Sequence, residues 1–172
     1  MILVLMGVSG AGKSTVGHTL AERLNCPFAD ADDYHPPANK AKMASGQPLN
    51  DEDRQPWLER LNQLMREWHE KGSSGILACS ALKDKYRVIL KQGMPEGTVQ
   101  FVLLDLPKET LTERLAARKH EYMNPKLLDS QLATLERPSD AVIVTNDRPV
   151  EQVVDEILNK VKQEGNDGAQ AV

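Results

Sequence analysis

The feature that most constrains this chain is a glycine-rich turn, residues 7–14, which directly follows a short apolar run. The turn reads Gly-Val-Ser-Gly-Ala-Gly-Lys-Ser, fits the pattern G-x-x-x-x-G-K-S/T in full, and leads into a segment of helical period. Glycines in this setting allow the backbone to curl with its N–H groups pointing inward, and a helix N-terminus adds positive potential. The turn is therefore predicted to hold phosphate groups.

The last residues of the turn supply the polar chemistry that a nucleoside triphosphate needs. Lys13 places a point charge near the outer phosphates, and the Ser14 hydroxyl can ligate magnesium. A glycine-rich turn without a ligand is the alternative, and the strand-to-helix context argues against it. GTPases, ATPase motors and small-molecule kinases share such turns, so the reaction stays open. The residues expected around the nucleotide are Gly7, Val8, Ser9, Gly10, Ala11, Gly12, Lys13, Ser14 and Thr15.

The composition is that of a single globular domain. The chain has 172 residues, of which 40% are hydrophobic and 27% are charged. A net charge of -4 does not indicate a basic surface for nucleic acid, so no such partner is expected. The apolar run 2–6 is too short for a signal peptide or a membrane span, so we expect a cytoplasmic protein without membrane contact. Cys26 and Cys79 are expected to be plain thiols.

Short apolar runs alternate with longer stretches of helical period, which predicts an α/β fold with a parallel sheet. The run 99–104 is apolar at nearly every position, as expected for a strand covered on both faces. Residues 164–172 are small and polar and are expected to form an unfolded tail, which leaves one domain at 1–163. The expected strands are 2–6, 27–30, 75–79, 99–104 and 141–144, and the expected helices are 13–24, 54–70, 108–118 and 150–161.

Acidic residues follow the second expected strand. In an open α/β sheet the carboxyl ends of the strands face the ligand crevice, which places Asp30 and Asp32 there. Phosphoryl transfer needs a carboxylate that orients the attacking hydroxyl and can accept its proton, and Asp32 is the candidate. An ordinary acidic turn is the alternative interpretation.

Magnesium ligands beyond Ser14 are left open by the sequence. The third expected strand ends in Cys79 and Ser80, where many phosphate-binding folds carry a metal-binding Asp. Asp30 acting through a metal-bound water, Asp32, or water alone could fill this role, and Asp105 after the fourth expected strand is a weaker candidate.

Three further blocks point to a family. They are Asp-Asp-Tyr-His-Pro at 32–36, Lys-Met-Ala-Ser-Gly-Gln-Pro-Leu-Asn-Asp-Glu-Asp-Arg-Gln-Pro-Trp-Leu at 42–58, and Cys-Ser-Ala-Leu-Lys-Asp-Lys-Tyr-Arg at 79–87. Together with the turn at 7–14, their order and spacing closely resemble the small bacterial gluconate kinases, also called thermoresistant gluconokinases. The resemblance covers nearly the whole chain, and its most specific part is the run from Pro48 to Trp57.

The resemblance implies a fold, a reaction and a set of site residues. The fold would be a three-layer P-loop domain with strand order 2-3-1-4-5 and a helical lid, and the protein would be a homodimer. The reaction would transfer the γ-phosphoryl group of ATP, with Mg²⁺, to the C6 hydroxyl of D-gluconate. A sugar acid needs a cation for its carboxylate and hydrogen-bonding groups for its hydroxyls. By resemblance, the side chains around gluconate would be Asp32, His35, Arg54, Lys83 and Arg87.

Taken without the resemblance, the basic residues have plainer interpretations. Arg54 would be a solvated residue at a helix start, and Lys83 and Arg87 would form the basic face of a helix. Two other functions also stay open. One is a small kinase for shikimate or a nucleoside monophosphate, although a monophosphate acceptor would call for more arginines. The other is a nucleotide-binding module without catalysis.

A basic cluster lies between two segments of helical period and resembles the lid of small metabolite kinases. The lid is expected at about residues 117–135, with Arg118 and then Arg114 on the transferring phosphates and Lys13 beside them. A solvated helix C-terminus, which favours basic residues, is the alternative. Residues 145–149, after the fifth expected strand, are expected near adenine.

Overall fold

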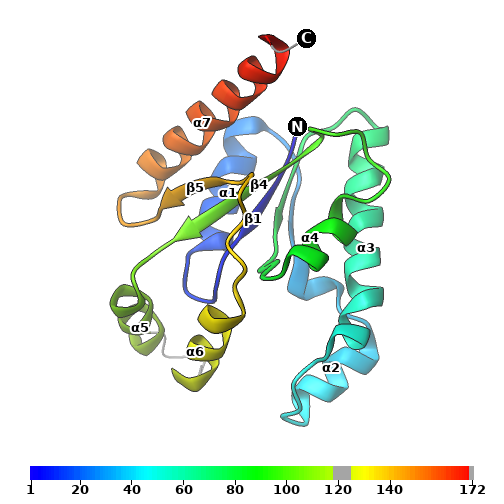
Figure 1. Cartoon of the computed structure of the whole chain (residues 1–172), viewed down its shortest axis with the longest axis vertical. Helices are drawn as coiled ribbons and strands as arrows, with labels where there is room; N and C mark the ends of the chain where they lie inside the picture. The colour runs from blue at the N-terminus through cyan, green and yellow to red at the C-terminus, as the bar shows by residue number, and fades with distance from the viewer. Residues whose placement is uncertain (118–124, 171–172) are drawn as a thin grey trace.

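A five-stranded parallel sheet forms the framework of the protein. The computed structural model describes residues 1–117 and 125–170 (Figure 1). The strand order is β2-β3-β1-β4-β5, which confirms the predicted α/β class and the predicted order. β1 is central, with Ile2 aligned with Gly75 on one side and with Val99 on the other. The strands are β1 Ile2–Met6, β2 Phe28–Asp30, β3 Gly75–Ala78, β4 Val99–Asp105 and β5 Val142–Thr145.

Helices cover both faces of the sheet and complete three layers. Within the described residues the helices are α1 Lys13–Leu24, η1 Ala31–Tyr34, α2 Pro37–Ala44, α3 Asp51–Glu70, α4 Asp84–Lys91, α5 Lys108–Ala117, α6 Pro125–Thr134 and α7 Val150–Gln170. α1 and α7 pack on one face, whereas α3 and α4 pack on the other (Figure 1). α2, α5 and α6 all lie at the end of the molecule toward which the strands run (Figure 1).

The central strand divides the hydrophobic core into two parts. Leu3 and Leu5 point toward α1 and α7, where they are buried with Leu20 and other apolar side chains. Val4 and Met6 point to the opposite face, toward α3 and α4. Burial on both faces explains why this strand is apolar at every position.

Two glycines allow close packing between layers. A Cβ atom on Gly17 of α1 would lie 2.4 Å from Cε2 of Phe28, the first residue of β2. A Cβ atom on Gly75 of β3 would lie 2.2 Å from Cε3 of Trp68 in α3. Each glycine therefore accepts an aromatic ring directly against its backbone.

The long helix α3 begins earlier than the sequence pattern predicts. Asn50 accepts a hydrogen bond from the Asp53 N–H at 2.8 Å, and the Asp53 carboxylate accepts one from the Asn50 N–H at 2.9 Å. This reciprocal capping box starts the helix at Asp51, three residues before the predicted start. η1 and α2 were not predicted, because their Asp- and Pro-rich sequence is also typical of turns.

The C-terminal segment is helical, so the prediction of an unfolded tail from residue 164 is wrong as far as Gln170. α7 continues to Gln170, past Val161, the last residue of its apolar stripe. A helix that is already nucleated by packed side chains gains one backbone hydrogen bond for each residue it adds, which explains the continuation. None of the described helices is long and apolar enough to cross a membrane.

Candidate active site

The loop between β1 and α1 has a backbone conformation that favours glycine. Gly7, Gly10 and Gly12 have φ angles of 142°, 88° and 92°. A Cβ atom on Gly7 would lie 2.9 Å from the carbonyl oxygen of Leu104, and one on Gly12 would lie 2.3 Å from Nδ2 of Asn146. The curled course of this P-loop therefore depends on these glycines, and it is the course that a phosphate-binding turn requires.

Lys13 lies folded over the P-loop. Its Nζ donates hydrogen bonds to the carbonyl oxygens of Gly7 at 2.9 Å and Val8 at 3.1 Å. The ammonium group is thereby held at the loop, where the outer phosphates of a nucleotide would bind. The loop and this lysine together fit a triphosphate.

Asn146 and Arg114 support the P-loop from the side. Asn146 is buried, and its Nδ2 donates to the carbonyl oxygen of Ala11 at 2.7 Å. Arg114 of α5 donates from Nη2 to the carbonyl oxygen of Asn146, also at 2.7 Å. The structure thus places Arg114 next to the loop, and it gives Asn146 a structural contact that the sequence pattern did not reveal. Arg118, the first choice in the lid, lies outside the described residues.

One side chain of α6 contacts the P-loop directly. Oε1 of Gln131, on α6, accepts a hydrogen bond from the N–H of Ser9 at 2.8 Å. That N–H is one of the donors expected for a phosphate oxygen. Gln131 was missed by the sequence analysis because its partner lies 122 residues earlier in the chain.

The acidic segment after β2 contacts the end of the P-loop motif. Ser14 donates from Oγ to Oδ2 of Asp30 at 3.3 Å, and Oδ1 of Asp30 accepts the N–H of Asp32 at 3.0 Å. A serine hydroxyl and a nearby carboxylate suit hydrated Mg²⁺, which keeps several of its waters. Among the described residues no cluster of three or more His, Cys, Asp or Glu side chains could hold a metal alone. A magnesium ion here would therefore depend on the nucleotide for further ligands.

The pKa of the Asp32 carboxyl is raised above its ordinary value. Desolvation raises its pKa, and the carboxylate of Asp30 raises it further, whereas His35 and Lys13 act in the opposite direction. A carboxylate with a raised pKa is a stronger base, which suits the predicted role of Asp32. Asp105, the weaker metal candidate, is paired instead with Arg137 at 3.0 Å.

His35 is held between α2 and α3. Its ring stacks on Trp57 with centroids 4.2 Å apart and planes 16° apart, and Nδ2 of Asn39 lies 3.3 Å from its Nδ1. Partial burial lowers the pKa of His35; Arg54 and Lys40 lower it further, while Asp32 raises it. The histidine therefore favours its neutral form.

Two of the predicted acceptor cations meet at one carboxylate. Nζ of Lys83 lies 3.5 Å from Oδ1 of Asp51, and Nη1 of Arg54 lies 4.0 Å from the same atom. The hydroxyl of Tyr86 donates to Oδ1 of Asp51 at 2.6 Å and receives a hydrogen bond from Arg54 at 3.2 Å. Lys85 pairs with the other oxygen, Oδ2. We call these five residues the Asp51 cluster.

The Asp51 cluster has a net positive charge, which suits an anionic ligand. Hydrogen bonds from Lys85 and Tyr86 hold the pKa of Asp51 well below its usual range, so this residue is ionised. Burial and the contact with Asp51 raise the pKa of Tyr86 to about 12, so the phenol stays neutral. Three cations therefore face one internal carboxylate. The sequence analysis missed Asp51, Lys85 and Tyr86, although all three lie in blocks that carried the family resemblance.

Arg87, also predicted at the acceptor, makes a set of contacts different from those of the Asp51 cluster. Its side chain is buried and donates to the carbonyl oxygens of Ala81 at 2.6 Å and Glu136 at 2.8 Å, and to Asp84 at 2.6 Å. Because these contacts use its planar guanidinium to join the β3–α4 loop to the chain after α6, Arg87 has a structural role.

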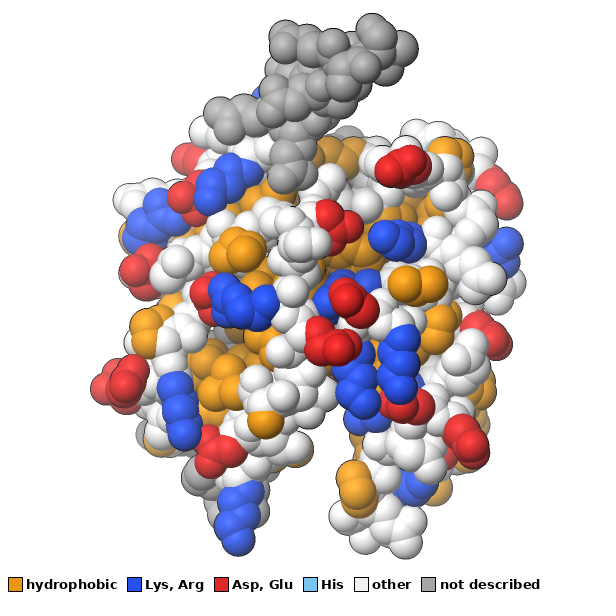
Figure 2. All heavy atoms as spheres, in the orientation of Figure 1, with side chains coloured by type: hydrophobic (Ala, Val, Ile, Leu, Met, Phe, Trp, Pro, Cys, Tyr) orange, Lys and Arg blue, Asp and Glu red, His pale blue; other side chains and the backbone are white. Residues whose placement is uncertain are grey.

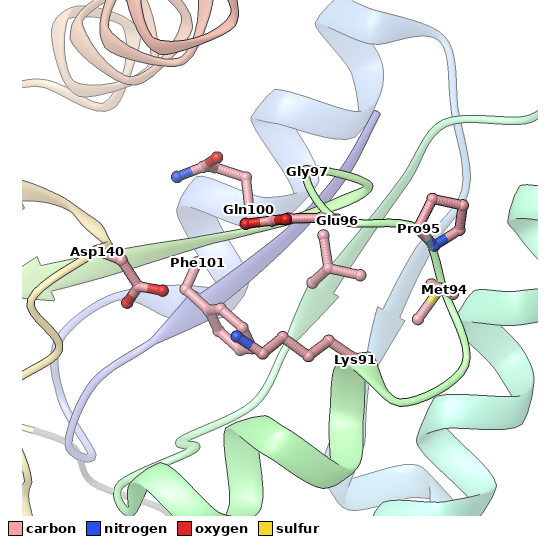
Figure 3. A pocket seen from close by; sticks show the side chains of 9 residues that line it. Lys91, Met94, Pro95, Glu96, Gly97, Gln100, Phe101 and Asp140 are labelled. Atoms are coloured by element: carbon pink, nitrogen blue, oxygen red, sulfur yellow. The ribbon is translucent and has the colours of Figure 1, made fainter. Parts of the chain in front are cut away.

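The carboxyl ends of the strands lead to an open side of the molecule. Figure 2 shows a notch there between the α5–α6 side and the α2–α3 side. A different pocket of about 450 Å³ lies around the start of β4, at the opposite end of the sheet (Figure 3). Phe101 and Met94 line it together with Lys91 and Asp140, and it contains none of the predicted site residues.

Comparison with known proteins places the chain among small kinases. A family model described as shikimate kinase matches residues 9–162. A probable gluconokinase of Dictyostelium discoideum is 42% identical over 173 residues, which cover 94% of this chain and 86% of the relative. The thermoresistant gluconokinase of Escherichia coli strain K12 is 40% identical, with 94% of each chain covered.

A solved structure with a similar fold is also a gluconokinase. The gluconokinase from Sinorhizobium meliloti 1021 superposes with a TM-score of 0.84 at 37% identity, covering 98% of this chain and 95% of that one. The three relatives described here are gluconokinases at 37–42% identity, whereas the matching family model is described as shikimate kinase. The resemblance inferred from the motifs is confirmed, and the chain belongs to the gluconokinase family of small P-loop kinases.

Proposed function

We propose that this protein transfers the γ-phosphoryl group of ATP to the C6 hydroxyl of D-gluconate, giving 6-phosphogluconate and ADP. The contact between Ser14 and Asp30 carries the proposal, because it joins the phosphate-binding loop to the acidic segment that would face the acceptor. The positive Asp51 cluster supplies the charge that a sugar acid requires. Membership of the gluconokinase family supports the choice of acceptor.

The donor side would be formed by the P-loop. Its N–H groups and Lys13 bind the phosphates, and Arg114 lies beside the loop, where it can approach them. Arg118 is proposed as a further lid cation on the transferring group. Mg²⁺ bound with ATP would neutralise phosphate charge, held by Ser14 and, through water, by Asp30.

The acceptor side would be formed by the Asp51 cluster and the loop after β2. Arg54 and Lys83 bind the carboxylate of gluconate, and His35 binds one of its hydroxyls. Asp32 orients the C6 hydroxyl and accepts its proton as the oxygen forms the new bond to the γ-phosphorus. The bond from that phosphorus to the bridging oxygen breaks at the same time, and ADP leaves with the electron pair.

Three features of the resemblance complete the proposal. The segment from α5 to α6 closes over ATP and excludes water, which would otherwise compete as acceptor. The protein acts in the cytoplasm, and it forms a homodimer. Sedimentation at micromolar concentration tests the dimer, and a single monomeric species would contradict it.

Shikimate is the second candidate acceptor, because the matching family model is described as shikimate kinase. A coupled assay of ADP release distinguishes the candidates when it is run with gluconate, shikimate, AMP or no acceptor. We expect gluconate alone to raise the rate above the acceptor-free background. Stimulation by shikimate or AMP alone would overturn the choice of acceptor. Binding of ATP without stimulation by any acceptor would favour a non-catalytic module.

A further inference from the structure

Asn39 makes two contacts that together fix the orientation of its side-chain amide. This residue of α2 is 4% exposed, and its Nδ2 donates to the carbonyl oxygen of Asp53 at 2.9 Å. A carbonyl oxygen only accepts hydrogen bonds, so the NH₂ group of the Asn39 side chain, and not its oxygen, must face the Asp53 carbonyl. The same Nδ2 lies 3.3 Å from Nδ1 of His35. The second amide hydrogen is therefore available to the imidazole.

This amide determines which ring nitrogen of His35 carries the proton. A neutral imidazole has one nitrogen that donates and one that accepts, and Nδ1 must accept if it faces an amide donor. We propose that Asn39 is a positioning residue that holds His35 as the neutral tautomer protonated at Nε2. The stack on Trp57 fixes the plane of the same ring, so this N–H has a defined direction.

The tautomer decides what His35 can do in the reaction. Nε2 carries a hydrogen and Nδ1 is occupied by Asn39, so no free lone pair remains to accept a proton from the acceptor. His35 is then a hydrogen-bond donor to a hydroxyl oxygen and is not the base. Of His35 and Asp32, only Asp32 can then act as the base, a consequence that rests on the proposed function.

The charged groups around His35 do not reverse this assignment. Asp32 on the preceding turn favours the protonated ring, whereas Arg54 on α3 and Lys40 on α2 oppose it. Partial burial of the ring also opposes protonation and has the largest effect. Asn39 also contacts the main-chain carbonyl of Asp53. Asp53 is held in place in turn, because its carboxylate pairs with Lys42 at 2.6 Å.

Nitrogen NMR of the folded protein tests the tautomer without any assay of activity. In ¹⁵N-histidine-labelled protein at neutral pH, the His35 signals should show Nε2 protonated and Nδ1 unprotonated. The chain has four histidines, so the loss of one set of signals in His35→Gln assigns them. A proton on Nδ1, or a doubly protonated ring at pH 7, would overturn the proposal.

The variant Asn39→Asp reverses the hydrogen bond, because a carboxylate accepts where the amide donates. We expect its His35 to gain a proton on Nδ1. Asn62→Asp is the matched control, since Asn62 is also buried and its Nδ2 donates to the carbonyl oxygens of Leu90 and Gln92 at 2.8 Å. The control should lose stability in a similar way and keep the His35 tautomer. An unchanged tautomer in Asn39→Asp would contradict the role of Asn39.

Kinetics separate positioning from general damage. Loss of one correctly directed hydrogen bond should raise the KM for gluconate about three- to tenfold in Asn39→Asp, with the KM for ATP changed less than about twofold. Asn62→Asp should not show this difference between the two substrates. If gluconate proves not to be a substrate, the proposed function fails while the NMR result still decides the tautomer.

Discussion

Ser14 on α1 donates a hydrogen bond to Asp30 at the end of β2, 16 residues further along the chain. The contact joins the last residue of the P-loop motif to the first residue of the acidic segment. It connects the two halves of the proposed site through a direct side-chain contact. Its consequences can be tested with substitutions that change charge and keep shape.

Asp30→Asn should weaken the response to magnesium. Asparagine can still cap η1, as Asp30 does by accepting the Asp32 N–H, but it removes the negative charge near the metal. We expect the Mg²⁺ concentration for half-maximal rate to rise about three- to tenfold at fixed ATP. The control is Asp33→Asn, a neighbouring exposed carboxylate, which should leave this value unchanged. Equal magnesium curves for the two variants would exclude a role for Asp30.

Asp32→Asn should lower kcat about 100-fold or more, because general-base catalysis typically contributes at least that factor. In the wild type, Asp32 must be ionised to act, so kcat falls as the pH drops through its pKa. Because that pKa is raised, the fall should begin at a higher pH than for an ordinary carboxyl group. Steady-state rates from pH 4 to 9 measure both effects. A variant that folds normally and keeps nearly full kcat would show that Asp32 is not the base.

Gln131→Ala should strengthen the binding of ATP. The Gln131 side chain occupies the N–H of Ser9, and a phosphate oxygen would have to displace it. A net hydrogen bond of about 1 kcal/mol predicts a decrease of roughly threefold to tenfold in the Kd, which calorimetry can measure. Ser130→Ala, at the adjacent exposed position of α6, is the control. Weaker binding in Gln131→Ala would mean that this side chain assists the nucleotide instead.

Gly17→Ala should destabilise the fold even though alanine favours helices. The added Cβ would lie 2.4 Å from the Phe28 ring, and overpacking of this kind costs about 1 to 3 kcal/mol. Urea denaturation of the wild type and the variant measures the difference. In a Phe28→Ala background the ring is gone, so the same substitution should be neutral or stabilising. An equal loss in both backgrounds would show that the ring is not the cause.

Much of the fold could be predicted because it depends on local patterns. Apolar runs located all five strands to within about one residue, and the helix over Lys13–Leu24 was predicted with its observed bounds. The P-loop was equally clear, since its glycines and Lys13 are adjacent in sequence. The errors fell where a local signal was ambiguous, as in η1 and α2. They also fell at the C-terminal end, where polar composition predicted an unfolded segment and α7 instead continues to Gln170.

The site could be predicted only in part, because several of its residues gain their roles from distant partners. Arg87 resembled a ligand-binding cation, and its buried contact with Glu136 depends on a chain segment 49 residues away. Asp51 and Asn39 were overlooked because an acid at a helix start and an amide within a short helix are ordinary in themselves. Their roles depend on Lys83, Lys85 and His35 lying beside them in the folded protein.

The position of β1 at the centre of the sheet has a consequence for how such enzymes diversify. The loop after this strand and its supports, Asn146 and Arg114, come from parts of the chain separate from α2 and the start of α3. Substitutions in segments 32–54 and 83–86, where the proposed acceptor residues lie, can therefore accumulate while the phosphate-binding loop and its supports stay intact. One ancestral scaffold can in this way give rise to kinases that share a donor and differ in what they phosphorylate.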